Sequence, residues 1–277
     1  MLCDGHGFYQ LYGMLSQNIP PRALNATRDH ELHDEIKQKS GGAFRYITSV
    51  ANICNIVGRM FFCNKAMYQA RRINPQWVAD QKHAFEARKG AALAPAFIST
   101  NDILTSNVLS NTKADVGLMA INFRNRIKNL TDDHFGNYEG TILFEAADYG
   151  SPELIRQSIS DGRYKGMVTG DNPEPYPGFF NRMKANVMIV TNWAGLYQHI
   201  EFEGCEHIVH SPLYVENAPA LVASILYMAT ATEMAIFVYD NTTTLLDACA
   251  EQGMVEAHGI PFPASAAVDV AETPISC

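Results

Sequence analysis

The sequence lacks the features that mark several specialised protein classes. Only 18% of its 277 residues are charged, while 47% are apolar, which excludes a largely disordered chain and allows one large domain or two modest ones. Cysteine is scarce, and its six positions are Cys3, Cys54, Cys63, Cys205, Cys249 and Cys277. So few cysteines do not make a disulfide framework, and no secretory leader is recognisable. We therefore expect free thiols and a cytoplasmic protein.

Positive charge is in deficit and long apolar runs are absent. Lys and Arg number 21 against 29 Asp and Glu, a net charge of −8, which argues against a nucleic-acid partner because phosphate binding needs clustered cations. The most apolar early stretch, residues 47–63, is interrupted by Asn52, Asn55 and Arg59. A membrane span needs about 20 mostly apolar residues, so we expect none here.

Standard nucleotide and hydrolase signatures are also missing. The sequence has no Gly-Lys-Ser/Thr phosphate loop, no G-x-G-x-x-G and no G-x-S-x-G nucleophile elbow. Histidines cluster at 30–35, but their spacing of three differs from the H-E-x-x-H spacing of four that places two imidazoles on one helix face. Cys205, His207 and His210 form a second cluster, whose histidines would point to opposite faces of a strand. We expect no metal site and rank a metal-dependent hydrolase last.

Periodicity and turn residues predict strands that alternate with helices, typical of a mixed α/β layered fold. Helices are expected at 7–15, 28–39 (stopped by Gly41-Gly42), 49–72, 76–89, 102–110, 152–162 and 242–252. Strands are expected at 116–123, 138–145, 187–191, 206–210, 220–228 and 234–239. A Pro/Gly loop is expected at 170–178, and the tail from 257 is expected to be frayed.

The N-terminal run Asp4-Gly5-His6-Gly7-Phe8 is the first of several motifs in a consistent order. Four segments follow it: FISTNDILTS at 97–106, INFRNR at 121–126, DHFGN at 133–137 and TNWAG at 191–195. The first motif resembles the end of H-x-x-x-D-G, and the others resemble the STNDALTA, VN-x-R-x-R, YFGN and DFGWG segments of the chloramphenicol acetyltransferase-like superfamily. That superfamily includes BAHD acyltransferases and condensation domains. The resemblance covers roughly residues 1–250.

The resemblance implies transfer of an acyl group from acyl-CoA to an alcohol or amine, with acyl-CoA as a co-substrate and no tightly bound cofactor. Two similar lobes would enclose a tunnel, and the motif His would be the general base. Asp4 would be structural, turned inward and paired with an Arg, with Arg124 the leading candidate, and Gly5 would permit a tight turn. We expect a remnant of the first lobe at 1–74, the second lobe at 75–256 and a flexible tail at 257–277.

Two departures from the family pattern affect the expected activity. The motif His would stand immediately before Met1, so we expect an N-terminally truncated chain that is inactive as it stands. His6 is the alternative base, although it follows the Asp-Gly pair and projects from a different point of the loop. The DFGWG position keeps only Trp193 and Gly195 and has lost its Asp.

Eight residues are candidate contacts for acyl-CoA or the acceptor. They are Ser99, Thr100, Asn101, Arg124, Arg126, Thr191, Asn192 and Trp193. The first three would meet the CoA tail or else cap a helix. The two arginines would meet CoA phosphates or form structural ion pairs. The last three would line the tunnel and donate to a tetrahedral oxyanion, or else simply end a strand beside a buried Trp.

A second hypothesis is a non-catalytic protein that binds CoA, a hydrophobic ligand or a partner chain. The missing half-lobe would leave an apolar face, and faces of that kind drive association. Self-association through that face is therefore also expected.

Overall fold

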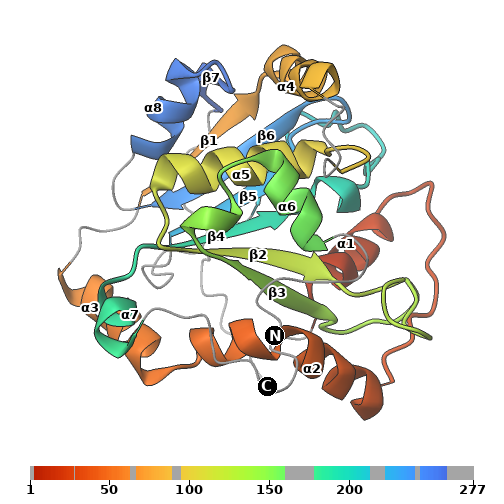
Figure 1. Ribbon diagram of the computed structural model, residues 1–277. Helices are drawn as coiled ribbons and strands as arrows, with labels where there is room; N and C mark the ends of the chain where they lie inside the picture. The colour runs from red at the N-terminus through yellow and green to blue at the C-terminus, as the bar shows by residue number, and fades with distance from the viewer. Residues whose placement is uncertain are drawn as a thin grey trace, which may run out of the picture.

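The computed structural model describes residues 3–27, 29–62, 67–88, 95–159, 178–212, 222–240 and 244–260 (Figure 1). Its helices are α1 (Gly5–Gly13), α2 (His30–Ile47), α3 (Val50–Phe62), α4 (Pro75–Arg88), α5 (Thr100–Thr112), α6 (Pro152–Ile159), α7 (Phe179–Lys184) and α8 (Thr244–Glu251). Its strands are β1 (Met67–Ile73), β2 (Val116–Asn122), β3 (Glu139–Phe144), β4 (Val187–Asn192), β5 (Val222–Met228), β6 (Met234–Asp240) and β7 (Val255–Gly259). Short 3₁₀ turns occupy Ala146–Asp148 and Ala194–Leu196.

The described strands form one sheet in the order β3-β2-β4-β5-β6-β1-β7. The central strands β2, β4 and β5 are parallel, and the other neighbours pair antiparallel. Parallel strands present their carboxyl ends at one edge, where open α/β sheets characteristically bind ligands. In this chain that edge is formed by the ends of β2 and β4, which are direct neighbours in the sheet.

Helices cover both faces of the sheet (Figure 1). Helices α4, α5, α6 and α8 lie over one face, where Leu104 and Val108 of α5 belong to the same core as Met119 and Ile121 of β2. Helices α2, α3 and α7 lie over the other face, where Ala43 of α2 packs in a smaller core. The expected mixed α/β layered fold is therefore confirmed.

Helix α2 corrects one expectation from the sequence, because it continues through Gly41-Gly42 to Ile47. Its second half buries Ala43 and Tyr46 against the sheet, and this tertiary packing outweighs the low helix propensity of glycine. The helix also approaches β3 closely. A Cβ atom at Gly140 would lie 2.8 Å from the Cβ atom of Ser40, so the strand needs glycine there.

Other elements depart from the sequence prediction. Residues 67–73, expected to continue a helix, form β1 between β6 and β7. The strand expected at 206–210 is absent, since those residues have no regular structure. Residues 255–259, partly assigned to the frayed tail, form β7. The expected loop at 170–177 and the tail beyond 260 lie outside the described residues, and the lobe boundary near 75 stays a prediction.

Among the described residues, no helix combines the length and the apolarity that crossing a bilayer requires.

Candidate functional site

Helix α1 is anchored at its first turn by Asp4. The Asp4 carboxylate caps the helix, because its Oδ1 accepts a hydrogen bond from the backbone N–H of Gly7 at 2.9 Å. Asp4 also donates its own backbone N–H to the carbonyl of Gly136. A side-chain oxygen that satisfies a free N–H at a helix start is favourable, and a negative charge there also interacts well with the helix dipole. The expectation that Asp4 points into the protein is confirmed.

The second carboxylate oxygen of Asp4 holds Arg124, which follows β2. Arg124 Nη1 lies 2.7 Å from Asp4 Oδ2, and both side chains are essentially buried, at 0% and 1% exposure. The same oxygen accepts the backbone N–H of Tyr138 at 2.8 Å. Burial of two charges is tolerated when each is paired and hydrogen-bonded in this way. The expected pairing of Asp4 with Arg124 is present.

The remaining donors of Arg124 are also engaged by the protein. Nε donates to the carbonyl of His134 at 3.0 Å, and Nη2 donates to the carbonyl of Gly136 at 3.2 Å. The guanidinium also lies over the Tyr138 ring, 5.1 Å from its centroid. Arg124 is therefore buried and paired within the protein, which is the structural role considered for it, and its contact with a CoA phosphate stays a prediction. Arg126, two residues later, is exposed.

A cavity of about 70 Å³ lies beside this anchor. Gly5 and His6 of α1 form one wall, and Thr191, Asn192 and Trp193 at the end of β4 form another. The remaining lining residues are Asp4, Ala120, Asn122, Glu139 and Leu196. The structure therefore brings together six residues that the sequence singled out, at the edge of the sheet where parallel strands end.

Gly5 lies directly against the opposite wall of the cavity. A Cβ atom there would lie 3.4 Å from Nε1 of Trp193 and 3.4 Å from Cδ1 of Leu196. A larger side chain would therefore project into the space between α1 and the end of β4. Among the described residues, neither the Trp193 indole N–H nor the Thr191 hydroxyl has a hydrogen-bond partner, so both donors remain available to a ligand in the cavity.

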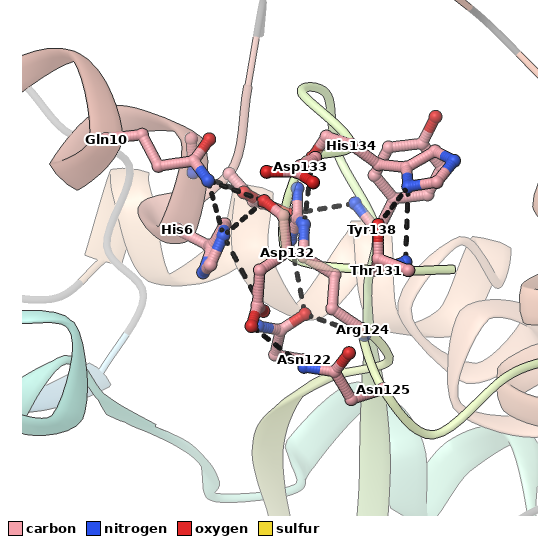
Figure 2. Close-up of polar contacts among 12 residues, drawn as sticks. His6, Gln10, Asn122, Arg124, Asn125, Thr131, Asp132, Asp133, His134 and Tyr138 are labelled. Carbon is pink, nitrogen blue, oxygen red and sulfur yellow. Dashed lines mark hydrogen bonds and ion pairs between the residues drawn. The ribbon is translucent and has the colours of Figure 1, made fainter. Parts of the chain in front are cut away.

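His6 is held by Gln10 and the Asp132 carbonyl (Figure 2). The Gln10 amide nitrogen lies 3.0 Å from His6 Nε2 and 2.5 Å from the Asp132 oxygen, so its two hydrogens can satisfy both acceptors. Nε2 accepts from Gln10 in one tautomer and donates to the Asp132 carbonyl, 3.1 Å away, in the other. In either tautomer this nitrogen of His6 is engaged by the protein.

Glu139, the first residue of β3, contributes a carboxyl group to the same cavity. Burial raises the pKa of Glu139, and the nearby negative charge of Asp4 raises it further, while the Gly5 backbone N–H and Arg124 act in the opposite direction. Burial disfavours the charged form of a carboxyl group. The site thus holds one carboxylate committed to an ion pair and a second carboxyl group with a greater tendency to be protonated.

A larger and more open cleft of about 350 Å³ adjoins the cavity. The two share Ala120, Asn122, Asn192 and Leu196. Polar side chains dominate the rest of this cleft, among them Asn101, Asn125, Arg126 and Asp132. Asn192 donates to the side-chain oxygen of Asn101 at 3.0 Å, which ties the end of β4 to the start of α5.

Ser99 forms a structural cap at the N-terminus of α5. Ser99 Oγ accepts from the Asp102 backbone N–H, and the Asp102 carboxylate accepts from the Ser99 backbone N–H, which forms a capping box. Asp102 is fully buried and pairs with Arg156 at 2.6 Å. Of the two roles considered for Ser99, capping is therefore the one observed. Contacts of Thr100 and Asn101 with a CoA tail stay predictions.

The structure adds one pair near the site that the sequence did not indicate. The Tyr9 hydroxyl lies 2.6 Å from Nε2 of His210, and both residues are buried. Burial raises the pKa of Tyr9 and lowers that of His210, with His207 lowering the latter further, so the pair is held neutral. The hydrogen bond joins α1 to a segment 201 residues away. No local sequence pattern signals a contact of this kind.

The histidine clusters do not assemble a metal site. In the described parts of the chain, no group of three or more His, Cys, Asp or Glu residues is arranged to hold a metal ion. His207 and His199 contact one another edge to face, with ring centroids 5.4 Å apart. His210 pairs with Tyr9, as described above, and Cys205 is a free and exposed thiol.

Comparison with known proteins identifies the fold. No protein-family model and no curated protein sequence matches the chain. It is similar in structure to TRI101 of F. sporotrichioides in complex with coenzyme A and T-2, with a TM-score of 0.53 and 10% identity over 92% of this chain and 64% of that one. It is also similar to F. graminearum TRI101 in complex with ethyl coenzyme A, with a TM-score of 0.52 and 12% identity over 90% and 62%.

A third similar structure is polyketide synthase associated protein 5 from Mycobacterium tuberculosis, with a TM-score of 0.50 and 12% identity over 90% of this chain and 68% of that one. The chain spans less than two thirds of the length of either TRI101 protein. At sequence identities of 10% and 12%, this similarity establishes the fold alone. The described residues therefore have the chloramphenicol acetyltransferase-like fold, the fold of BAHD-type acyltransferases, which the sequence motifs implied.

Proposed function

We propose that the cavity between α1 and the end of β4 is part of an acyl-transfer site, where an acyl group passes from acyl-CoA to an alcohol or amine. The observation that carries the proposal is the buried Asp4–Arg124 ion pair, which fixes the first turn of α1 against the end of β2 beside the cavity. The likeness of the fold to that of CoA-bound TRI101 supports the choice of thioester.

The general base in this proposal is the imidazole that the H-x-x-x-D-G motif of the similar family places four residues before Asp4, a position that the 277 residues do not include. It removes a proton from the acceptor as the acceptor oxygen or nitrogen attacks the thioester carbonyl. The tetrahedral intermediate then collapses, the carbon–sulfur bond breaks, and the departing CoA thiolate receives that proton. Asp4, Gly5 and Arg124 act indirectly, because they hold the backbone turn that follows the base.

Donors to the developing oxyanion come from the opposite wall. The Thr191 hydroxyl and the Trp193 indole N–H both line the cavity and have no partner among the described residues. Preorganised donors of this kind stabilise negative charge in the transition state. We therefore assign oxyanion stabilisation to these two groups and positioning of the Asn101 amide to Asn192.

The proposal does not use His6 as the base. Its Nε2 is already engaged by Gln10 at 3.0 Å and by the Asp132 carbonyl at 3.1 Å, and His6 follows the Asp4-Gly5 pair instead of preceding it. A general base needs a free lone pair within reach of the proton that it removes. The 277 residues therefore supply the anchor and one wall of the proposed site.

The adjoining open cleft is the proposed entry for acyl-CoA. Arg126 is exposed there, and Asn101 and Asn125 supply amide groups. Arginine binds phosphate oxygens through paired N–H donors, which suits the diphosphate of CoA. In this assignment Arg126 replaces Arg124 as the residue that contacts the CoA phosphate.

The test is CoA-thiol release from acetyl-CoA and longer acyl-CoA thioesters, with primary alcohols and amines as acceptors. One protein is the 277-residue chain, and a second is the chain extended upstream so that His stands four residues before Asp4. The matched control carries Ala at that position. We expect turnover only with His, and a loss of about 10²–10⁴-fold in the Ala control.

The same proteins distinguish the alternative of a non-catalytic binder. A binder would bind CoA in calorimetry with equal affinity in the His and Ala chains, and neither chain would release thiol above the uncatalysed rate. That outcome would overturn the acyl-transfer proposal. It would favour a protein that holds CoA, a hydrophobic ligand or a partner chain.

A further inference from the structure

Helix α3 turns its polar side inward and its apolar side outward. Its buried residues include Asn52 and Asn55, and the Asn55 amide donates to the carbonyls of Arg182 and Ala185 at 3.0 and 2.8 Å. Its exposed residues at helical spacing are apolar: Val50, Ile53, Val57 and Phe61. A surface helix of a globular protein normally has the opposite arrangement. This orientation indicates that the outer side of α3 has a partner.

Helix α7 extends the same apolar face. It packs directly against α3, and the two helices lie together at one corner of the molecule, on the opposite side of the view from α1 (Figure 1). Phe179, Phe180 and Met183 of α7 are exposed, with Phe180 and Phe61 each 78% accessible. We call the seven exposed residues the α3–α7 face. Contiguous apolar patches of this kind mark interaction sites.

The charges on these two helices are all positive. Arg59 of α3 and Arg182 and Lys184 of α7 are partly or fully accessible, and neither helix contains Asp or Glu. Among the described residues, Asp115 lies near enough to act on the same Tyr46 hydroxyl as Arg59 and Arg182, and its carboxylate accepts the backbone N–H of Asn186. The whole chain has a net charge of −8, so a face with three cations and no acid of its own stands apart from the rest.

From these observations we propose that the α3–α7 face docks on an anionic lipid surface. Exposed Phe and aliphatic side chains would enter the boundary between headgroups and acyl chains, while the flanking cations would contact the lipid phosphates and carboxylates. Interfacial helices bind in this way through apolar area together with attraction to anionic lipids. The inference is independent of the acyl-transfer proposal, since no residue of the face lines the cavity or the cleft.

Charge favours a lipid surface over a second copy of this chain. In a two-fold dimer the same patch faces itself, so three cations on each copy would be brought together and would repel one another. An anionic bilayer supplies the opposite sign over the whole patch. Self-association through this face is therefore the competing outcome of the test.

The experiment is co-sedimentation of the full chain with vesicles of phosphatidylcholine alone or with 30% phosphatidylserine. We expect binding to the anionic vesicles only, with weaker binding as the salt concentration rises. Phe61→Ser, Phe180→Ser and Lys184→Glu should each lower the partition coefficient by about tenfold, given the apolar area or charge that each removes. All three residues are accessible on the surface, and circular dichroism checks that each variant folds.

Matched control variants lie elsewhere on the surface. Phe202→Ser removes another exposed Phe and Lys82→Glu reverses another exposed Lys, and neither should change vesicle binding. Absence of binding to anionic vesicles would overturn the proposal, as would equal losses in the control variants. A concentration-dependent dimer in sedimentation velocity that Phe61→Ser dissociates, without vesicle binding, would also overturn it and assign the face to self-association.

Discussion

Asp4 and Arg124 are 120 positions apart in the sequence, and their side chains form an ion pair at 2.7 Å in the interior of the protein. One carboxylate caps α1 through Oδ1 and binds the guanidinium and the Tyr138 backbone through Oδ2. The start of the helix, the end of β2 and the turn before β3 are therefore fixed by a single side chain.

Breaking this pair should strongly destabilise the fold. Asp4→Asn or Arg124→Met leaves one buried charge without its counter-charge, and we expect each to lower the free energy of unfolding by about 3–5 kcal/mol. The double variant should lose less than the sum of the two, because no unpaired charge remains. Urea denaturation of the four proteins measures both the losses and the coupling.

Arg126→Met serves as the matched control for this cycle. Arg126 is exposed and stands two residues from Arg124, so its replacement should change the unfolding free energy by less than about 0.5 kcal/mol. Equal losses at Arg124 and Arg126 would show that the buried pair is not what holds α1.

The Tyr9–His210 pair should make stability depend on pH. Burial lowers the pKa of His210 in the folded chain, whereas the unfolded chain takes up a proton near the ordinary value of 6.5. The unfolded state therefore binds more protons below that pH, and stability should fall as the pH drops through 6.5. His210→Gln should flatten this part of the stability profile by up to about 1.4 kcal/mol per pH unit, measured by denaturation between pH 5 and 8.

His199→Gln is the control. His199 is exposed, so its replacement should leave the slope of the unfolding free energy against pH unchanged. Tyr9→Phe should cost about 1–3 kcal/mol at pH 8, because the buried Nε2 of His210 loses its donor. A His210→Gln profile as steep as that of the original chain would contradict the assignment.

Glu139 should make stability depend on pH in the direction opposite to that of His210. Its pKa is raised in the folded chain, so the folded state retains a proton that the unfolded chain loses near pH 4.5. Stability then falls as the pH rises from about 4.5 through the folded pKa. Glu139→Gln cannot lose that proton, so its stability relative to the original chain should increase over this range and then level off. The control is Glu203→Gln at an exposed position, which should show no such increase.

Removing the capping box of α5 should lower the free energy of unfolding by a smaller amount than breaking the buried ion pair. Ser99→Ala removes the oxygen that accepts the Asp102 backbone N–H and should lower the unfolding free energy by about 1 kcal/mol. Thr100→Ala, at the next residue, removes no cap and should cost less. If the two variants lost the same amount of stability in thermal unfolding, the capping role of Ser99 would be wrong.

Much of the fold after residue 75 could be predicted from local pattern. Helix α4, β2 and β6 all lie within one residue of their predicted bounds, because apolar runs and turn residues there agree with the tertiary structure. The Asp4–Arg124 pair was also predictable, since both residues stand in motifs of known order.

The errors arose where distant contacts decide the local structure. Residues 67–73 form a strand because β6, more than 160 positions later, pairs with them. Helix α2 passes through two glycines because its far half packs on the sheet. The cavity wall shared by His6 and Glu139, and the pairing of Tyr9 with His210, likewise depend on segments far apart in the sequence. No window of neighbouring residues contains this information.

The most direct test of the account is the rate of thiol release from acetyl-CoA by the 277-residue chain, by its His6→Ala variant and by the extended chain with His four residues before Asp4. The account predicts that the first two match a heat-inactivated control and that only the extended chain turns over. Acceptor-dependent thiol release by the 277-residue chain that is lost in His6→Ala would contradict it, because the base would then be His6.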